Sequence, residues 1–97
     1  MSAGMKEVRP LSAAEYEQMC REVRAEFGPR VTPEALLYDL CKRVYHHLHG
    51  YGQDLKLPYA SGPREEVYKA ALRRLVGEGQ DEPFDALEVA ARYLPGI

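Results

Sequence analysis

Hydrophobic and polar positions recur with helical spacing in four stretches of the chain, and Pro and Gly residues separate these stretches. The spacing predicts helices over residues 12–27, 33–49, 63–77 and 83–94. We therefore expect an all-α fold, a small four-helix domain with one long irregular loop over residues 50–62. Residues 11–97 would form this single helical domain, preceded by a flexible N-terminal segment over residues 1–10.

The ends of the first two helices carry specific local signals. Ser12 and Glu15 have the spacing of a capping box, in which each side chain bonds the other residue's backbone N–H. Thr32 precedes Pro33, the arrangement of an N-cap followed by a proline in the first helical position. Gly28 is suited to end the first helix, because glycine adopts the left-handed conformation without strain.

The second and fourth helices are the most apolar. At about 100° per residue, the apolar positions of the second helix cover roughly 200° of its circumference, namely Leu36, Leu37, Tyr38, Leu40, Cys41, Val44, Tyr45 and Leu48. An arc this wide predicts a central helix that contacts at least two others.

The fourth helix has apolar residues on most sides. Its predicted core face holds Phe84, Leu87, Ala90, Ala91 and Leu94, and a second apolar face holds Ala86, Val89 and Tyr93. A helix that is apolar all round is usually buried all round. We therefore expect the second face to form a homodimer interface.

The composition is that of an ordinary globular domain. The chain has 97 residues, of which 45% are apolar and 29% charged. It contains no apolar run long enough for a transmembrane helix, and its N-terminus has no signal-peptide pattern, which predicts a cytoplasmic protein. Asn is absent and Arg outnumbers Lys, a bias typical of a GC-rich genome and compatible with a thermophile.

Charge is unevenly distributed along the chain. Residues 42–74 contain seven Lys and Arg against three Asp and Glu, whereas both flanking segments are acidic and the net charge is −2. The basic segment supports an alternative function, nucleic-acid binding through Lys42, Arg43, Arg64, Lys69, Arg73 and Arg74. The pattern does not favour a DNA-binding helix-turn-helix, because the second helix would present the carboxylates of Glu34 and Asp39 to the DNA phosphates.

The loop over residues 50–62 is the longest irregular stretch, and loops of this length often carry function. Its apolar and aromatic residues predict a partner-binding surface made of Tyr51, Leu55, Leu57 and Tyr59. Tyrosine is enriched at interfaces because it combines contact area with a polar tip.

No motif predicts catalysis or a cofactor. Cys20 and Cys41 lie in apolar stripes, where thiols usually serve packing. His46 and His49 share a helix face and provide a second alternative, a metal site, although further ligands would have to come from elsewhere. The helix dipole explains histidines in a last turn without a metal.

The sequence therefore predicts a small interaction or regulatory protein without a catalytic constellation. We expect it to act as a homodimer or as a subunit of a complex, with itself or another protein as partner. Nucleic-acid binding and metal binding are the two alternatives.

Overall fold

The computed structural model of the chain describes residues 10–57, 62–77, 80, 82–94 and 96–97. Four helices are present in this part: α1 (Ala13–Phe27), α2 (Pro33–His49), α3 (Arg64–Gly77) and α4 (Ala86–Tyr93). The same residues contain no strand, so the predicted all-α class is confirmed. None of these helices combines the length and apolarity needed to cross a bilayer.

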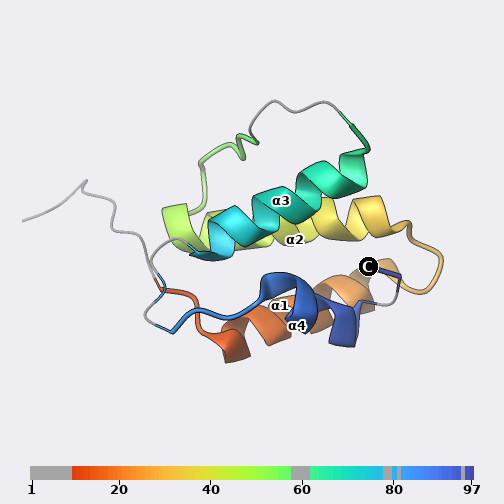
Figure 1. Cartoon of the computed structure of the whole chain (residues 1–97), viewed down its shortest axis with the longest axis horizontal. Coiled ribbons are helices and arrows are strands. Elements are labelled where there is room, and N and C mark those ends of the chain that lie inside the picture. Colours follow the sequence, from red (N-terminus) through yellow and green to blue (C-terminus); the bar gives the residue numbers. More distant parts are fainter. Residues whose placement is uncertain (1–9, 58–61, 78–79, 81, 95) are drawn as a thin grey trace, which may run out of the picture.

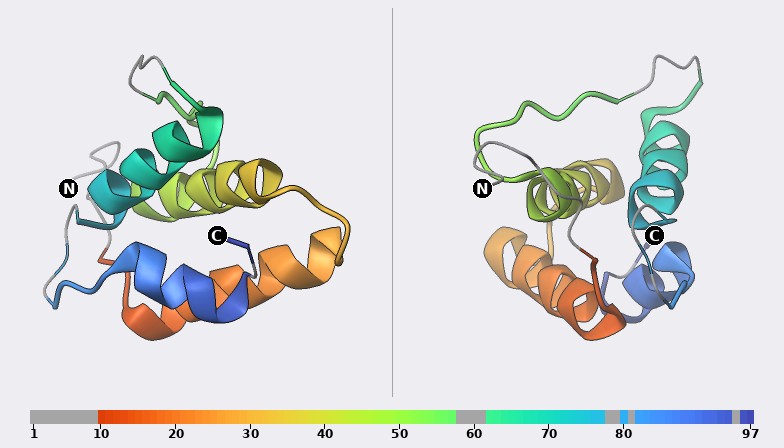
Figure 2. Two further views of the ribbon diagram at one scale, coloured as in Figure 1. Left: turned by 45° about the vertical axis from the view of Figure 1, so that its right-hand side comes forward. Right: turned by 90° about the vertical axis from the view of Figure 1, so that its left-hand side faces the viewer.

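The helices form two layers (Figure 1), with α2 and α3 in one and α1 and α4 in the other. Contacts join α1 to α2 and α4, and α3 to α2 and α4, whereas the described residues place no contact between helices on the diagonals. The end-on view in Figure 2 shows this square arrangement. Every helix therefore contacts two others, which agrees with the two neighbours expected for α2.

The predicted caps are present. The Ser12 hydroxyl accepts from the Glu15 backbone N–H at 3.1 Å, and the Glu15 carboxylate accepts from the Ser12 N–H at 3.0 Å. The Thr32 hydroxyl accepts from the Ala35 N–H at 3.2 Å. Gly28 ends α1 with φ 77°, a conformation that L side chains rarely adopt.

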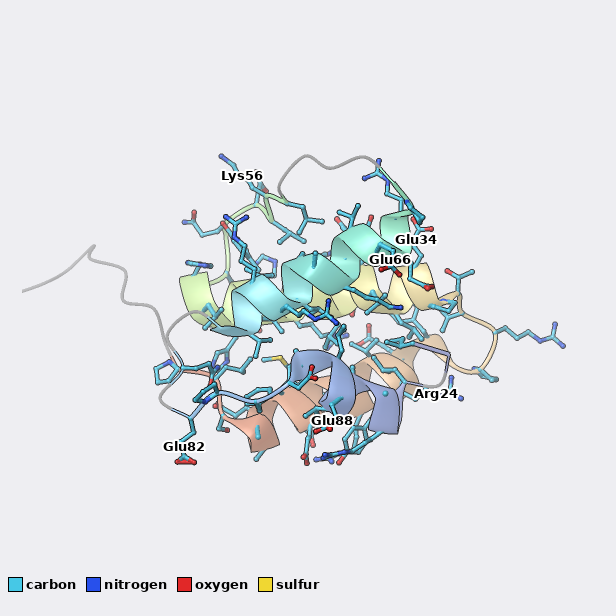
Figure 3. The ribbon with its side chains drawn as sticks, viewed as in Figure 1. Arg24, Glu34, Lys56, Glu66, Glu82 and Glu88 are labelled. Carbon is cyan, nitrogen blue, oxygen red and sulfur yellow. The ribbon has the colours of Figure 1, made fainter. Side chains whose placement is uncertain are left out.

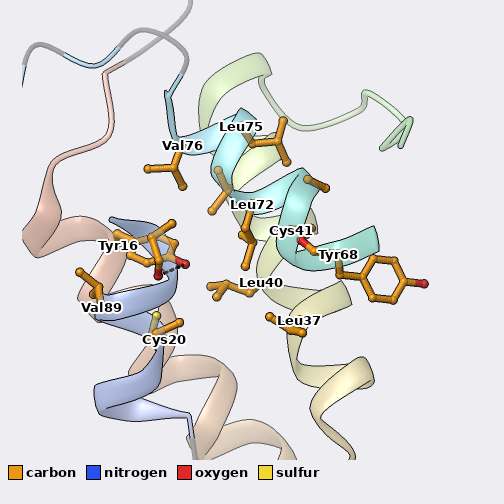
Figure 4. Packing of buried hydrophobic residues seen from close by; sticks show 14 of the residues in the cluster. Tyr16, Cys20, Leu37, Leu40, Cys41, Tyr68, Leu72, Leu75, Val76 and Val89 are labelled. Atoms are coloured by element: carbon orange, nitrogen blue, oxygen red, sulfur yellow. Dashed lines mark hydrogen bonds between the residues drawn. The ribbon is translucent and has the colours of Figure 1, made fainter. Parts of the chain in front are cut away.

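The core lies between the two layers and consists of apolar side chains from all four helices together with Leu11 and Leu94 (Figure 4). No polar or charged residue is buried among the described residues. Both cysteines are buried and free. The Cys41 thiol lies 3.6 Å from the carbonyl oxygen of Tyr68 and donates to it.

The side of α4 that is buried in the core differs from the predicted side. Ala86 and Val89, assigned above to a homodimer interface, are 2% and 4% exposed and belong to the core of their own chain. Ala91, assigned to the core, is exposed. The helix begins at Ala86, three residues later than the expected bound at 83, because Asp85 is its N-cap and accepts from the backbone N–H groups of Leu87 and Glu88.

The burial of Ala86 and Val89 within their own chain removes the structural reason for pairing two copies through this face of α4. Tyr93, the third residue of the predicted interface, is half-buried, and its hydroxyl donates to the Glu17 carboxylate at 3.1 Å. The guanidinium of Arg21 lies over the Tyr93 ring at 5.4 Å. Side chains of α1 therefore contact the face of α4 that was predicted to bind a second subunit.

The apolar arc of α2 is narrower than predicted. Leu36, Leu37, Leu40, Cys41, Val44 and Leu48 are buried. Tyr38 is 42% exposed and Tyr45 is half-buried. A tyrosine can lie at the edge of a core because its ring is apolar and its hydroxyl is easily hydrated. The two tyrosines thus join the outer side of α2.

Candidate functional site

The outer side of α2 carries aromatic and basic side chains from Tyr38 to its last residue, His49. Tyr38, Lys42, Tyr45, His46 and His49 fall within an arc of about 100° at 100° per residue, opposite the buried face. Segment 50–57 follows α2 and lies against this side, held by Leu55 and Leu57, which are half-buried and pack on the core. We call this surface the α2–loop face and include in it Tyr51, Lys56 and, from α3, Tyr68 and Arg74.

Aromatic rings contact one another across this face. The rings of His46 and Tyr51 are stacked, with centroids 5.3 Å apart and planes 14° apart. Tyr45 lies 4.6 Å from His49, and Tyr38 lies 5.6 Å from Tyr68. Tyr51 is nevertheless 87% exposed, so only one side of its ring is covered. An open aromatic ring is thereby held in a defined place.

Two hollows open on the face. The first, which we call the His46 hollow, has a volume of about 330 Å³ and is lined by Tyr38, Lys42, His46, Gln53, Asp54 and Leu55. The Lys42 ammonium lies 5.8 Å from the centre of the Tyr38 ring. The Nδ1 atom of His46 is buried and has no hydrogen-bond partner in the described part of the chain.

The second hollow, which we call the His49 hollow, has a volume of about 190 Å³ and lies between α2, segment 50–57 and α3. Its lining consists of Tyr45, His49, Lys56, Leu57, Ala71, Arg74 and Leu75. Three basic residues from three separate segments meet here, and no carboxylate lines the hollow. Figure 3 shows Lys56 extending from the loop on the opposite side of the molecule from Glu82 and Glu88.

A larger hollow of about 470 Å³ lies at the start of α1 and shares no lining residue with the two hollows of the α2–loop face. It is lined by Pro10, Leu11, Ser12, Ala13, Glu15, Gln80, Glu82, Pro83 and Phe84. Its described charged residues are both acidic, and its Ser12 hydroxyl already caps α1. Residues 1–9, 78–79 and 81, which neighbour several of its lining residues in the sequence, lie outside the described part of the chain.

The predicted partner residues have different roles. Tyr51 is exposed, whereas Leu55 and Leu57 anchor the loop and each line one hollow. Tyr59 lies outside the described residues. Lys56, Tyr38 and Tyr45 were not predicted to belong to one face. The spacing of Tyr38, Lys42, Tyr45 and His49, which repeats every three to four residues, could have indicated the two tyrosines, whereas Lys56 lies on the loop outside this repeat.

The two histidines predicted as metal ligands line different hollows. His46 stacks on Tyr51, and His49 packs on Tyr45. Within the described ranges, no three His, Cys, Asp or Glu side chains are grouped as a metal site requires. His47, on another side of α2, lies 3.2 Å from the Pro10 carbonyl oxygen and 3.9 Å from the Glu15 carboxylate.

The thiols are poor nucleophiles in this fold. Burial, with a smaller effect from the nearby carboxylate of Glu17, raises the pKa of Cys20 to about 12. Burial alone raises the pKa of Cys41 to about 12. Because the thiolate is the reactive form, both side chains are held in their unreactive state at neutral pH.

Comparisons of the chain with protein-family models, with curated proteins and with solved structures find no match. The candidate site therefore rests on the geometry of this chain alone.

Proposed function

We propose that this protein is a small, non-catalytic interaction protein that works as a subunit of a complex, and that its partner binds the α2–loop face. The observation that carries the proposal is the Tyr51 ring, stacked on His46 on one side and 87% exposed overall. Exposed aromatic anchors beside basic side chains are typical of the centres of binding interfaces.

Two further observations support a binding role. The loop that presents Tyr51 is anchored by Leu55 and Leu57, so a partner would meet a largely preformed surface and less ordering would oppose binding. The thiols are protonated and buried, and the Ser12 hydroxyl is engaged as a cap, so these groups offer no activated nucleophile.

Site-specific photo-crosslinking in living cells of the native host tests this proposal. A photoreactive phenylalanine analogue replaces Tyr51 in one strain and Phe27 in a control strain. Phe27 is also exposed, at 42%, but lies at the far end of α1. We expect a discrete adduct at position 51 and none at position 27. The absence of an adduct at position 51, or equal adducts at both positions, would reject the proposal.

The homodimer predicted from the sequence remains a proposal of its own, and the α4 face used to predict it is enclosed by α1. Light scattering on the purified protein at tens of micromolar tests it. A mass twice that of the chain would support self-association, and a crosslink from position 51 to a second copy would place the α2–loop face at the interface.

A further inference from the structure

Three cations without a carboxylate partner in the described part of the chain, Lys42, Lys56 and Arg74, line the two hollows of the α2–loop face. Of the six basic residues predicted from the sequence to bind nucleic acid, two are neutralised within the fold. Arg43 pairs with Asp39 at 2.6 Å and Glu26 at 2.7 Å. Lys69 pairs with Glu65 and Glu66 of its own helix at 3.8 and 3.5 Å.

The remaining four and Lys56 differ in position, and three of these five cations line the hollows of this face. Lys42 and Arg74 each line one of its hollows, and Arg64 and Arg73 are exposed on α3. None of these five side chains has a carboxylate within ion-pair distance in the described part of the chain. Uncompensated cations of this kind attract an anionic ligand.

The His49 hollow has the chemistry of a phosphate site. Lys56 and Arg74 supply charged donors from the loop and from α3, and His49 lines the hollow from the last turn of α2. Leu57, Ala71 and Leu75 form an apolar lining that lowers the local polarity and strengthens such contacts. An Arg guanidinium and a Lys ammonium are the groups that usually bind phosphate oxygens.

The other half of the face has the chemistry of a base-stacking surface. The exposed side of Tyr51 and the rings of Tyr38 and His46 beside the first hollow offer flat apolar areas close to unpaired cations. Aromatic rings interleaved with cations are the usual way in which proteins hold single-stranded nucleic acid. Gln53 and Asp54, which also line the His46 hollow, could hydrogen-bond to base edges there.

We propose that the α2–loop face binds single-stranded nucleic acid, with a backbone phosphate in the His49 hollow and a base stacked on Tyr51. This inference rests on the proposed function, since it names the partner of the same face. A phosphorylated peptide is the rival ligand. The stacked aromatic rings favour a nucleic acid, because phosphopeptide sites depend on clustered arginines, and a single arginine lines this hollow.

The test is fluorescence anisotropy of the full chain with labelled oligonucleotides of about 12 nucleotides, a length within the range one small domain covers. Oligo(U), oligo(dT) and a duplex of the same length are compared. We expect both single strands to bind more tightly than the duplex. The ratio between RNA and DNA identifies the natural ligand, because only RNA carries the 2′-hydroxyl.

The dependence of the binding affinity on salt concentration measures how many phosphates the protein contacts. Each phosphate neutralised on a single strand predicts that affinity falls by about 2.5-fold between about 50 and about 200 mM salt, so the slope gives the number of phosphates that the face binds. Affinity that does not change with salt would overturn the proposed role of Lys56 and Arg74.

Charge-matched variants locate the site. Lys56→Glu and Arg74→Glu should each weaken binding by about tenfold or more, whereas Arg30→Glu, an equal charge change in the α1–α2 turn, should have a much smaller effect. Tyr51→Ala should weaken binding about tenfold and Phe27→Ala should not. Circular dichroism melts verify that each variant is folded. Equal losses in Lys56→Glu and Arg30→Glu would show that net charge alone matters, and would overturn the site.

The failure of this inference is distinguishable from that of the proposed function. If no oligonucleotide binds at low salt while position 51 still crosslinks to a protein in cells, the nucleic-acid proposal falls and the interaction role stands. A phosphopeptide that binds with the same dependence on Lys56 and Arg74, in the absence of oligonucleotide binding, would likewise overturn it. A nuclease-sensitive adduct at position 51 supports both.

Discussion

The hydroxyl of Tyr16 in α1 donates a hydrogen bond to the carbonyl oxygen of Ala86, the first residue of α4, at 3.0 Å. The two residues are 70 positions apart in the chain, and Tyr16 is completely buried. The bond is drawn in Figure 4, where Tyr16 lies beside Val89. It fixes the start of a helix of only 8 residues, which would be marginal alone.

Tyr16→Phe removes this bond and keeps the ring. We expect a loss of about 1 kcal/mol in the free energy of unfolding, since a typical intramolecular hydrogen bond contributes that much. Urea denaturation measures it. Tyr38→Phe is the control, because its side chain is 42% exposed and we expect a change close to zero. Equal effects of the two variants would contradict the structural role of the Tyr16 hydroxyl.

Val89→Glu tests the facing of α4. In a homodimer built on this face, the substitution would separate the subunits and leave each one folded. In the present fold it places a carboxylate in the core, because Val89 is 4% exposed, and should cost about 3–5 kcal/mol. Thermal melts followed by circular dichroism measure the loss. Ala91→Glu, on the exposed side of the same helix, should be nearly neutral, and a stable, fully helical Val89→Glu monomer would refute the facing described above.

Arg43 holds α1 and α2 together and should matter for stability rather than binding. Its guanidinium contacts Glu22 and Glu26 of α1 and Asp39 of α2. Because the side chains of its partners Glu22 and Glu26 are 49% and 63% exposed, we expect Arg43→Gln to lower the free energy of unfolding by only about 1 kcal/mol, and less at high salt. Urea titrations at two salt concentrations measure both effects. Oligonucleotide affinity should change little, and a loss as large as that of Lys56→Glu would contradict the division between structural and binding cations.

Alkaline pH should destabilise the protein through its buried thiols. Burial raises the pKa of Cys20 and Cys41 from 9.0 to about 12 in the folded chain, and burial also raises the pKa of Tyr16. In the unfolded chain these groups ionise at their ordinary pKa values. The contribution of the two thiols to stability is therefore complete below about pH 9 and is lost as the pH rises from about 9 towards 12.

Each thiol should cost about 2 kcal/mol by about pH 10.5, since one pKa unit corresponds to about 1.4 kcal/mol. Urea midpoints under reducing conditions at about pH 8 and about pH 10.5 measure the loss. Cys20→Ala removes one of the two ionising thiols and should show a shallower fall. A midpoint that does not change with pH would mean that the thiols ionise equally in both states.

Local stereochemistry was enough to predict most of the fold. The capping box at Ser12, the Thr32–Pro33 start and the Gly28 end act within one turn of the chain, so they can be read without knowing any neighbour. The bounds of α1, α2 and α3 therefore agree with the prediction to within one residue.

Only the tertiary structure decided which apolar and amphipathic residues contact a neighbouring helix and which remain exposed. Val89 and Ala91 are both apolar, and the position of α1 determines that Val89 is buried and Ala91 exposed. Tyr38 can lie in a core or at its edge, because it has an apolar ring and a polar tip. The meeting of His49, Lys56 and Arg74 depends on how the loop and α3 fold back on α2, and contacts between segments distant in sequence leave no local pattern that could predict them.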